Sequence, residues 1–241
     1  MHRFFVDHIK GNSAILADSA QLHHIRDVLR LKINDAVIIS DGAGNEYNGV
    51  ITSINKKQAV FNLTSVQTQK RSSIVLTVAC AIPKGSHMDE IIDGLTQLGV
   101  KRIIPMMTDR VVVKLDEAKS ESRLKRWQTI AQSAARQCQR SDIPVITPVT
   151  DIEKVVTDTQ NLDLKLIPHL SGRRKSIKSV LSKKSYKNVI VLIGPEGDFT
   201  PSEVELALHN GFTPVSLGDT VLRVATAAIA VAAYIRFALD K

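Results

Sequence analysis

The sequence has little of what disulfide scaffolds, metal centres and membrane segments require. Its only cysteines, Cys80 and Cys138, are far apart and form no CxxC or Cys/His ligand pattern, so we predict neither a disulfide nor a metal site. No stretch approaches the roughly 18 consecutive apolar residues of a membrane span. The first residues, MHRFFVDHIKG, also lack the apolar segment of a signal peptide. We therefore expect a cytoplasmic protein that does not enter a membrane.

Common catalytic fingerprints are absent as well. The chain has no GxGxxG, no P-loop, no HExxH and no GxSxG. The lack of the dinucleotide fingerprint argues against a nicotinamide enzyme with a classical phosphate loop, but it leaves other cofactor geometries open. The adjacent pair His23 and His24 suggests a metal site only superficially, because neighbouring helical residues point in different directions and do not share one ion. We interpret the pair as polar surface or a nucleic-acid contact.

Acidic residues are missing from one basic stretch and scarce in another. The 241-residue chain carries a formal net charge of +8, and residues 171–187 hold seven Lys and Arg with no acidic residue. Residues 101–140 hold ten Lys and Arg against four Asp and Glu. Clustered positive charge is typical of surfaces that bind a phosphate backbone. A solvated surface without a partner stays open, and an anionic membrane surface is the weaker alternative because neither stretch is clearly amphipathic.

The pattern of elements changes near residue 70. Before it, β-branched segments separated by the turn signals DGAGN and KK predict a small antiparallel sheet or barrel, interrupted by one short helix. Asp18 and Gln21 form a capping pair for that helix. Its predicted apolar face consists of Leu22, Ile25, Val28 and Leu29. The polar stretch at residues 67–73 is the best candidate for a linker.

After residue 73, strand and helix patterns alternate. This alternation predicts an α/β fold with a mostly parallel sheet that is covered by helices on both faces. Predicted strands lie at residues 74–82, 100–107, 164–168, 189–193 and 213–217, and predicted helices at residues 86–99 and 118–138. Pro105 suggests an edge strand or a strand end. Trp127 could stack on a base, although core packing is the commoner use of a tryptophan in such a helical stripe.

The stretch VIVLIGPEGDFTPSE, residues 189–203, predicts a buried strand, a tight loop and a helix start. Thr200 supplies a capping hydroxyl, Pro201 occupies the first helical position, and Glu203 follows three residues after the cap. Gly194 and Gly197 permit a close approach that a Cβ would forbid. Ligands bind at the carboxyl ends of strands in open α/β sheets, although an ordinary strand-to-helix turn explains the pattern equally well.

The last segment, LGDTVLRVATAAIAVAAYIRFALDK, leads from a strand through a glycine loop into an alanine-rich helix. So many small side chains let another backbone approach closely. The partner could be an internal helix, the same helix of a second subunit, or a ligand. Two classes of function therefore stay open at this point, a nucleic-acid-modifying enzyme and a binding module without chemistry.

Six blocks of the sequence follow one another in a characteristic order: HHIRDVLRLK, DGAGNEYNGVI, IPKGSHMDEIIDGLTQLGVKRIIPMMTDRVVVK, RWQTIAQSAARQCQRSDIPVI, LIGPEGDFTPSE and SLGDTVLRVATAAIA. Together they resemble the RsmE-type 16S rRNA methyltransferases of the SPOUT class. The resemblance implies a PUA-like RNA-binding β-barrel at residues 1–68 and a SPOUT domain with a deep trefoil knot at residues 73–241. It also implies a homodimer that uses S-adenosylmethionine to methylate uracil N3 of a uridine in 16S rRNA of the small ribosomal subunit. An RNA-binding ribosome assembly factor with weak or no methyl transfer is the alternative.

The resemblance also implies roles for individual residues. Arg223 and Glu196 are the expected catalytic residues. The expected cofactor-binding residues are His169, Leu170, Ile193, Gly194, Pro195, Glu196, Gly197, Ser216, Leu217, Gly218, Leu222, Arg223 and Ala228. The expected RNA-binding residues are Arg3, His24, Arg26, Arg30, Lys84, Arg110, Lys114, Arg136, Arg140, Arg173, Arg174 and Lys175.

This chain departs from the family pattern at the expected site. The usual LRTETA is LRVATA here, so Val224 and Ala225 replace a Thr and a Glu, and Asp198 replaces the usual second glycine after GPEG. If the missing Glu normally positions the uracil or accepts its proton, Glu196 or Asp198 has to take over that role. Otherwise the enzyme is slow.

Overall fold

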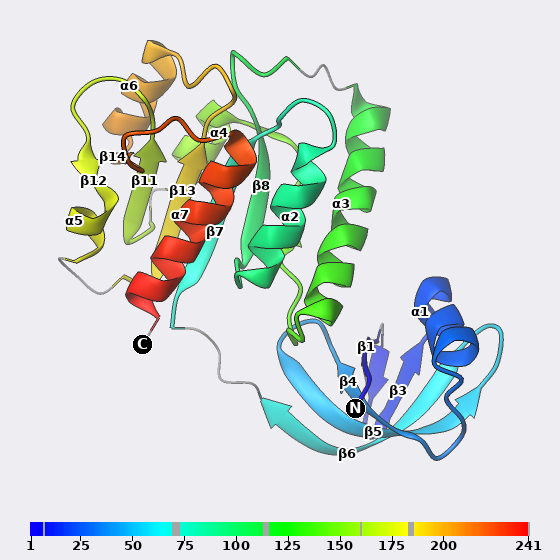
Figure 1. Ribbon diagram of the computed structural model, residues 1–241. Coiled ribbons are helices and arrows are strands. Elements are labelled where there is room, and N and C mark those ends of the chain that lie inside the picture. The colour runs from blue at the N-terminus through cyan, green and yellow to red at the C-terminus, as the bar shows by residue number, and fades with distance from the viewer. Residues whose placement is uncertain (7, 69–72, 113–115, 160, 183–185, 241) are drawn as a thin grey trace. The chain divides into compact units, whose positions relative to one another are not determined.

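The computed structural model describes residues 1–6, 8–68, 73–112, 116–159, 161–182 and 186–240 (Figure 1). The chain folds into two compact units. The first contains Met1–Arg71 and Ala135–Ile143, and the second contains Ser72–Ala134 and Pro144–Lys241. Ala135–Ile143 falls inside the predicted second domain but packs with the first unit.

The first unit is built on a curled six-stranded sheet (Figure 1). In spatial order its strands are β1 (Arg3–Phe5), β4 (Ala36–Ser40), β5 (Asn45–Ile54), β6 (Ala59–Thr68), β3 (Ser13–Leu16) and β2 (His8–Lys10). All neighbours are antiparallel except β1 and β4. Alternate residues such as Val37 and Ile39 point into one core, as expected for a sheet with one buried face.

The predicted short helix is present but changes its winding. Asp18 caps α1 (Ser19–His23) by accepting a hydrogen bond of 2.8 Å from the Gln21 amide, as predicted. The next residues, His24–Val28, form a π-helical turn. Ile25 on this turn is fully buried, whereas Val28 is 57% exposed. The prediction that Val28 belongs to the apolar face was wrong, because the wider turn shifts the residues that face the core.

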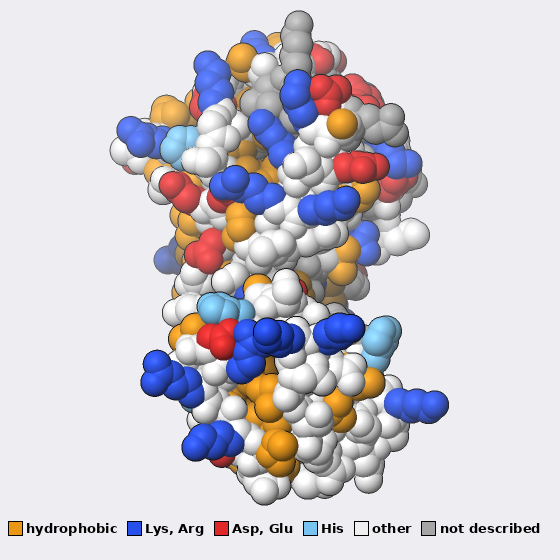
Figure 2. All heavy atoms as spheres, turned by 90° about the vertical axis from the view of Figure 1, so that its right-hand side faces the viewer, with side chains coloured by type: hydrophobic (Ala, Val, Ile, Leu, Met, Phe, Trp, Pro, Cys, Tyr) orange, Lys and Arg blue, Asp and Glu red, His pale blue; other side chains and the backbone are white. Residues whose placement is uncertain are grey.

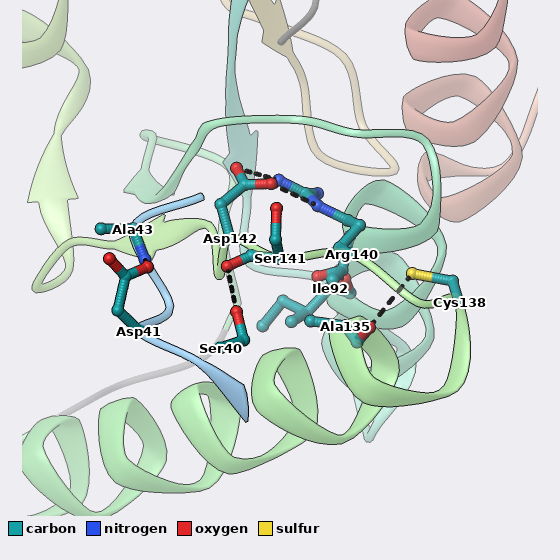
Figure 3. A network of polar contacts seen from close by, with 10 residues as sticks. Ser40, Asp41, Ala43, Ile92, Ala135, Cys138, Arg140, Ser141 and Asp142 are labelled. Atoms are coloured by element: carbon teal, nitrogen blue, oxygen red, sulfur yellow. Dashed lines mark hydrogen bonds and ion pairs between the residues drawn. The ribbon is translucent and has the colours of Figure 1, made fainter. Parts of the chain in front are cut away.

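Ala135–Ile143 is fastened to the first unit by a polar network around the end of β4 (Figure 3). Ser40 Oγ donates to the Ser141 carbonyl over 2.7 Å, and Ile143 N donates to the Gly42 carbonyl over 3.0 Å. Arg140 Nη2 lies 2.8 Å from Asp142 Oδ2. The bonds from Ser40 and from Ile143 join segments about a hundred positions apart, which local sequence patterns do not record.

The second unit contains a sheet in which all neighbouring strands are parallel, so the mixed α/β fold class is confirmed. Its spatial order is β10 (Thr150–Asp151), β8 (Arg102–Met107), β7 (Val75–Ala81), β13 (Asn188–Ile193), β11 (Leu164–Pro168), β14 (Thr213–Ser216) and β12 (Lys175–Ser176), while β9 (Val145–Ile146) pairs with β8. Residues 189–193 are all buried, as a strand covered on both faces requires.

Helices cover both faces of this sheet (Figure 1). The helices are α2 (His87–Gln97), α3 (Glu117–Gln137), α4 (Ile152–Thr157), α5 (Ile177–Leu181), α6 (Pro201–His209) and α7 (Val224–Leu239). Side chains of α4 and α6 share a core with β7, β8, β11 and β13. On the other face α7 packs against β7, β13 and α2. Gly94 of α2 allows this close packing, because a Cβ there would lie 2.9 Å from Ile229 Cδ1.

Pro105 does not mark an edge or an end of the sheet. It lies within β8, which pairs with β7 on one side and with β9 and β10 on the other. The outer side consists of two short strands, which pair with residues 102–103 and with residues 106–107 of β8. Pro105 lies in the gap between them, where the proline costs no ladder hydrogen bond on that side.

Four further expectations have different outcomes. Trp127 is 2% exposed and belongs to the core, and Cys80 and Cys138 are both free. Within the described residues, no helix is long and apolar enough to cross a membrane. The trefoil knot stays a prediction.

Candidate functional site

A cavity of about 260 Å³ opens where β13, β11 and β14 end. These three strands are neighbours and parallel, so their carboxyl ends meet at one edge of the sheet. The cavity is lined by residues from the loops that follow the three strands and by the first turn of α7. Its walls combine aliphatic side chains with a few charged and polar groups, as is usual in small-molecule sites.

The loop after β13 is a tight turn, residues 194–198. Asp198 N donates to the Pro195 carbonyl over 3.0 Å, which closes the turn. Gly194 is needed here because a Cβ would lie 3.0 Å from the ring of Phe199. The close approach expected at Gly194 is therefore made by the protein's own aromatic ring. Asp198 has a φ of +59°, an uncommon conformation for a residue with a side chain.

Three other loops hold this turn at three successive residues. Lys84 N, after β7, donates to Glu196 Oε1 over 3.2 Å. Arg110 Nη1, after β8, donates to the Gly197 carbonyl over 2.5 Å. Leu170 N, after β11, donates to Asp198 Oδ2 over 2.8 Å. The turn is thus held in one conformation by its neighbours, which is the arrangement that a preorganised site needs.

The predicted helix start is confirmed and has a second role. Thr200 and Glu203 form a capping box at the start of α6, with Thr200 N donating to Glu203 Oε2 over 2.7 Å. The other oxygen of Glu203 accepts a hydrogen bond of 2.9 Å from Asp109 N. The buried Glu203 carboxylate therefore also fixes the backbone next to Arg110, which holds the Gly197 carbonyl.

His169 forms part of the cavity wall and is 8% exposed. Its Nδ1 is buried and has no hydrogen-bond partner among the described residues. Burial lowers the pKa of His169, while the charge of Asp198 raises it and the charge of Arg174 lowers it. Arg174 also lines the cavity, and its Nη1 donates to the His169 carbonyl over 2.9 Å. The imidazole is therefore held in its neutral form.

The loop after β14 supplies the third side of the cavity. Gly218 has a φ of +133°, which favours glycine, and nothing lies within 4 Å of the position of a Cβ. Arg223 precedes α7 as its N-cap residue, is exposed and lines the cavity. No hydrogen bond or ion pair engages its side chain within the described residues. Its charge is therefore available at the mouth of the cavity.

Comparisons with known proteins place this geometry in a family. Residues 70–236 match the RNA methyltransferase domain family, and residues 16–64 match the RNA methyltransferase PUA domain. A curated relative named ribosomal RNA small subunit methyltransferase E, from Synechocystis, is 34% identical over 95% of this chain and 74% of its own length.

The chain belongs to the ribosomal RNA small subunit methyltransferase E family.

Solved structures of similar proteins cover nearly the whole chain. The family member from Neisseria gonorrhoeae, bound to S-adenosyl methionine, is 26% identical with a TM-score of 0.87, covering 98% of this chain and 97% of that chain. Lpg2936 from Legionella pneumophila, in complex with the bound cofactor SAM, is 30% identical with a TM-score of 0.86 and the same coverage. The resemblance inferred from the sequence blocks is thus confirmed at the level of the family.

Most of the cofactor-binding residues expected from the methyltransferase E family come together at the cavity. All of them except Gly197 and Ala228 line it. Gly197 faces Arg110 instead, and Ala228 is fully buried in α7. The expected set omitted the lining residues Pro168, Arg174, Asp198, Val215, Thr220, Val221, Val224 and Ala227. They flank expected residues in the same loops, so contiguity within each loop was the signal that could have found them.

In the first unit, the expected RNA-binding residues differ in exposure. Arg3 is paired with Glu46 over 2.8 Å, and the two side chains are only 11% and 8% exposed. Arg140, also 11% exposed at its side chain, is paired with Asp142, and burial lowers the pKa of the half-buried Arg136. Arg26 is paired with Asp27 over 2.6 Å. Only His24 and Arg30 are fully exposed among the expected residues of this unit.

In the second unit, Lys84, Arg173 and Lys175 are exposed, whereas Arg174 belongs to the cavity wall. Arg110 is exposed but holds the Gly197 carbonyl. Lys114 lies outside the described residues. Figure 2 shows Lys and Arg side chains spread over the surface of both units rather than gathered in a single patch.

Proposed function

We propose that this protein transfers a methyl group from S-adenosylmethionine to N3 of a uridine in 16S rRNA of the small ribosomal subunit. The observation that carries the proposal is the cavity, which is built from the three loops that the family resemblance implies for the cofactor. The relative from Neisseria gonorrhoeae was crystallised with S-adenosyl methionine and has the same fold over nearly its full length.

The residues of the cavity fit this cofactor chemically. Ile193, Leu217 and Leu222 offer an apolar wall to an adenine ring, and the His169 ring forms part of the same lining. Side chains of both charges line the cavity, which suits a ligand that carries an ammonium, a carboxylate and a sulfonium group. When bound, the cofactor supplies an activated methyl group on its sulfonium sulfur.

The chain's own residues have to accept a proton from the uracil and to stabilise the negative charge that then develops on its ring. Uracil N3 carries a proton at neutral pH, so methylation requires its removal and stabilisation of the negative charge that develops on the ring oxygens. Arg223, which has no side-chain partner in the described part of the chain and lines the cavity, is the cation best placed to oppose that charge. Glu196 is the candidate proton acceptor, because the Lys84 amide holds its carboxylate at the cavity wall.

RNA binding is proposed for the exposed basic residues only. His24 and Arg30 in the first unit and Lys84, Arg173 and Lys175 in the second present their side chains to solvent. Phosphate contacts require such access, and each releases counterions when it forms. The buried pair of Arg3 and Glu46 is instead a structural element.

A homodimer through α7 is the proposed assembly. One side of α7 packs inside the second unit through Val224, Ala228, Val231, Ala232 and Ile235. On its other side, Phe237 is 80% exposed and Tyr234 is 39% exposed, with Ala230 also exposed. A two-fold contact of this face with its own copy would cover these side chains. Light scattering should show a dimer that Phe237→Glu converts to a monomer, while a parent monomer at micromolar concentration would contradict the assembly.

The activity is tested with small ribosomal subunits that lack the modification. After incubation with the protein and S-adenosylmethionine, mass spectrometry of the digested 16S rRNA should detect 3-methyluridine. Binding of the subunits without methyl transfer would instead favour an assembly factor. One observation favours this second candidate, because Val224 and Ala225 put no carboxylate at the start of α7 where the family pattern has a Glu.

A further inference from the structure

Asp198 is unusual in three respects. It adopts a left-handed backbone conformation, with a φ of +59°, that residues with side chains rarely occupy. Its carboxylate accepts a hydrogen bond of 2.8 Å from the Leu170 amide, so it joins the loop after β13 to the loop after β11. It is half-buried and lines the cavity. A strained residue that persists at a ligand cavity is a reason to look for a function.

The charge balance of the cavity indicates what that function is. The charged side chains that line it, within the described residues, are Arg174, Arg223, Glu196 and Asp198. Arg223 and Glu196 are exposed, so water weakens their fields inside the cavity. Arg174 is half-buried like Asp198, but its guanidinium is directed to the His169 carbonyl. At the buried His169 ring, the charge of Asp198 raises the pKa of the imidazole by more than the charge of Arg174 lowers it.

We propose that Asp198 is a specificity-determining residue that makes this cavity favour the positively charged methyl donor over its neutral product. The proposal rests on the proposed function. The donor carries a sulfonium cation, whereas the product left after methyl transfer is an uncharged thioether of nearly the same shape. Hydrophobic walls treat these two ligands alike, and both ligands carry the same ammonium and carboxylate groups. Only the donor has the additional sulfonium charge, so a half-buried carboxylate attracts the donor more strongly than the product. Asp198 thereby favours exchange of product for fresh donor after each turnover.

The experiment compares the two ligands on one set of variants by isothermal titration calorimetry at low salt. Asp198→Asn keeps an oxygen that can accept the Leu170 amide, and Asn tolerates the left-handed conformation, so the variant removes the charge alone. Its affinity for S-adenosylmethionine should fall by about three- to tenfold, while its affinity for S-adenosylhomocysteine stays within about twofold. Asp198→Gly permits the same backbone and also removes the tie to Leu170, so its loss of donor affinity should be at least as large.

Asp219→Asn is the matched control. Asp219 lies in the loop after β14, is exposed and does not line the cavity, so its neutralisation should leave both affinities unchanged. If Asp198→Asn lowered both affinities equally, or left both unchanged, the inference would be overturned while the proposed function stood. If the unmodified protein bound neither ligand, the proposed cofactor and this inference would both be overturned.

Discussion

Three arginines of the first unit differ in their partners from the arginines around the cavity of the second unit. In the first unit, Arg3, Arg26 and Arg140 are each paired with a carboxylate. Around the cavity of the second unit, Arg110 and Arg174 instead hold backbone carbonyls, and Arg223 has no protein partner within the described residues. A guanidinium paired with a carboxylate is electrically satisfied, whereas one that faces solvent without a charged partner keeps its charge for a ligand. Net charge alone therefore says little about where an anion binds.

The largest effect is expected from breaking the buried pair of the first unit. Arg3→Met removes the guanidinium that lies 2.8 Å from the Glu46 carboxylate, which is 8% exposed at its side chain, and should lower the free energy of unfolding by about 3 to 5 kcal/mol. Urea denaturation measures this difference. Lys10→Met, an exposed position on the edge strand β2, is the control and should change stability by less than about 0.5 kcal/mol. Equal effects of the two variants would contradict a structural role for Arg3.

Arg223→Ala should lower the rate of methyl transfer with little change in RNA affinity. A cation that opposes charge developing only in the transition state contributes to the barrier, and losing one such group costs on the order of a hundredfold in rate. Single-turnover kinetics on bound RNA give the rate, and a filter-binding titration gives the affinity. Arg223→Lys keeps the charge and should recover part of the rate. A loss of affinity with an unchanged rate would place Arg223 in RNA docking instead.

The double variant Arg173→Ala, Lys175→Ala should weaken RNA binding without slowing the chemical step. Both side chains are exposed, and each lost phosphate contact should reduce the salt dependence of binding by about one unit of slope. Arg174 is left intact because it belongs to the cavity wall. Lys154→Ala, on exposed α4 surface beside Asp158, is the control for the loss of a basic residue. Unchanged binding at every salt concentration would remove these two residues from the proposed RNA surface.

The smallest effect is expected from His169. Because burial lowers its pKa in the folded protein, the unfolded chain binds a proton more readily, and stability is lost as the pH falls below about 6.5. The contribution of the neutral imidazole to the free energy of unfolding is fully present above that pH. Urea denaturation between pH 5 and 8 should therefore show a shallower pH dependence for His169→Asn than for the parent protein. Parallel curves for the two proteins would show that the imidazole titrates as it does in the unfolded chain.

Local patterns predicted the elements that depend on neighbours in sequence. The capping box of Thr200 and Glu203, the cap at Asp18 and the buried strand at residues 189–193 were all anticipated, because each involves residues within a few positions of one another. The site was anticipated only through the family resemblance. The pattern at residues 189–203 predicted only a strand, a tight loop and a helix, because a ligand site and an ordinary strand-to-helix turn share that pattern.

Long-range pairing decided most of what the patterns missed. The bond between Arg110 and Gly197 spans 87 positions, that between Ser40 and Ser141 spans 101, and that between Leu170 and Asp198 spans 28. A proline suggested an edge strand or a strand end at Pro105. The gap between β9 and β10, which accommodates the proline beside an inner strand, forms only when the chain folds. Such partners are chosen by topology, which local periodicity does not record.

The sequence by itself determined the alternation of elements, the helix caps, the glycine at the end of β13 and the family. Each of these is encoded in side-chain size, hydrogen-bonding groups or spacing along a short stretch. Only the tertiary structure decided which arginines are paired, which side chains surround the cavity, and that the carboxylate of Asp198 joins two of its loops. The physical reason is that the effect of a charge depends on its distance from other charges and from water, and both are set by the folded chain.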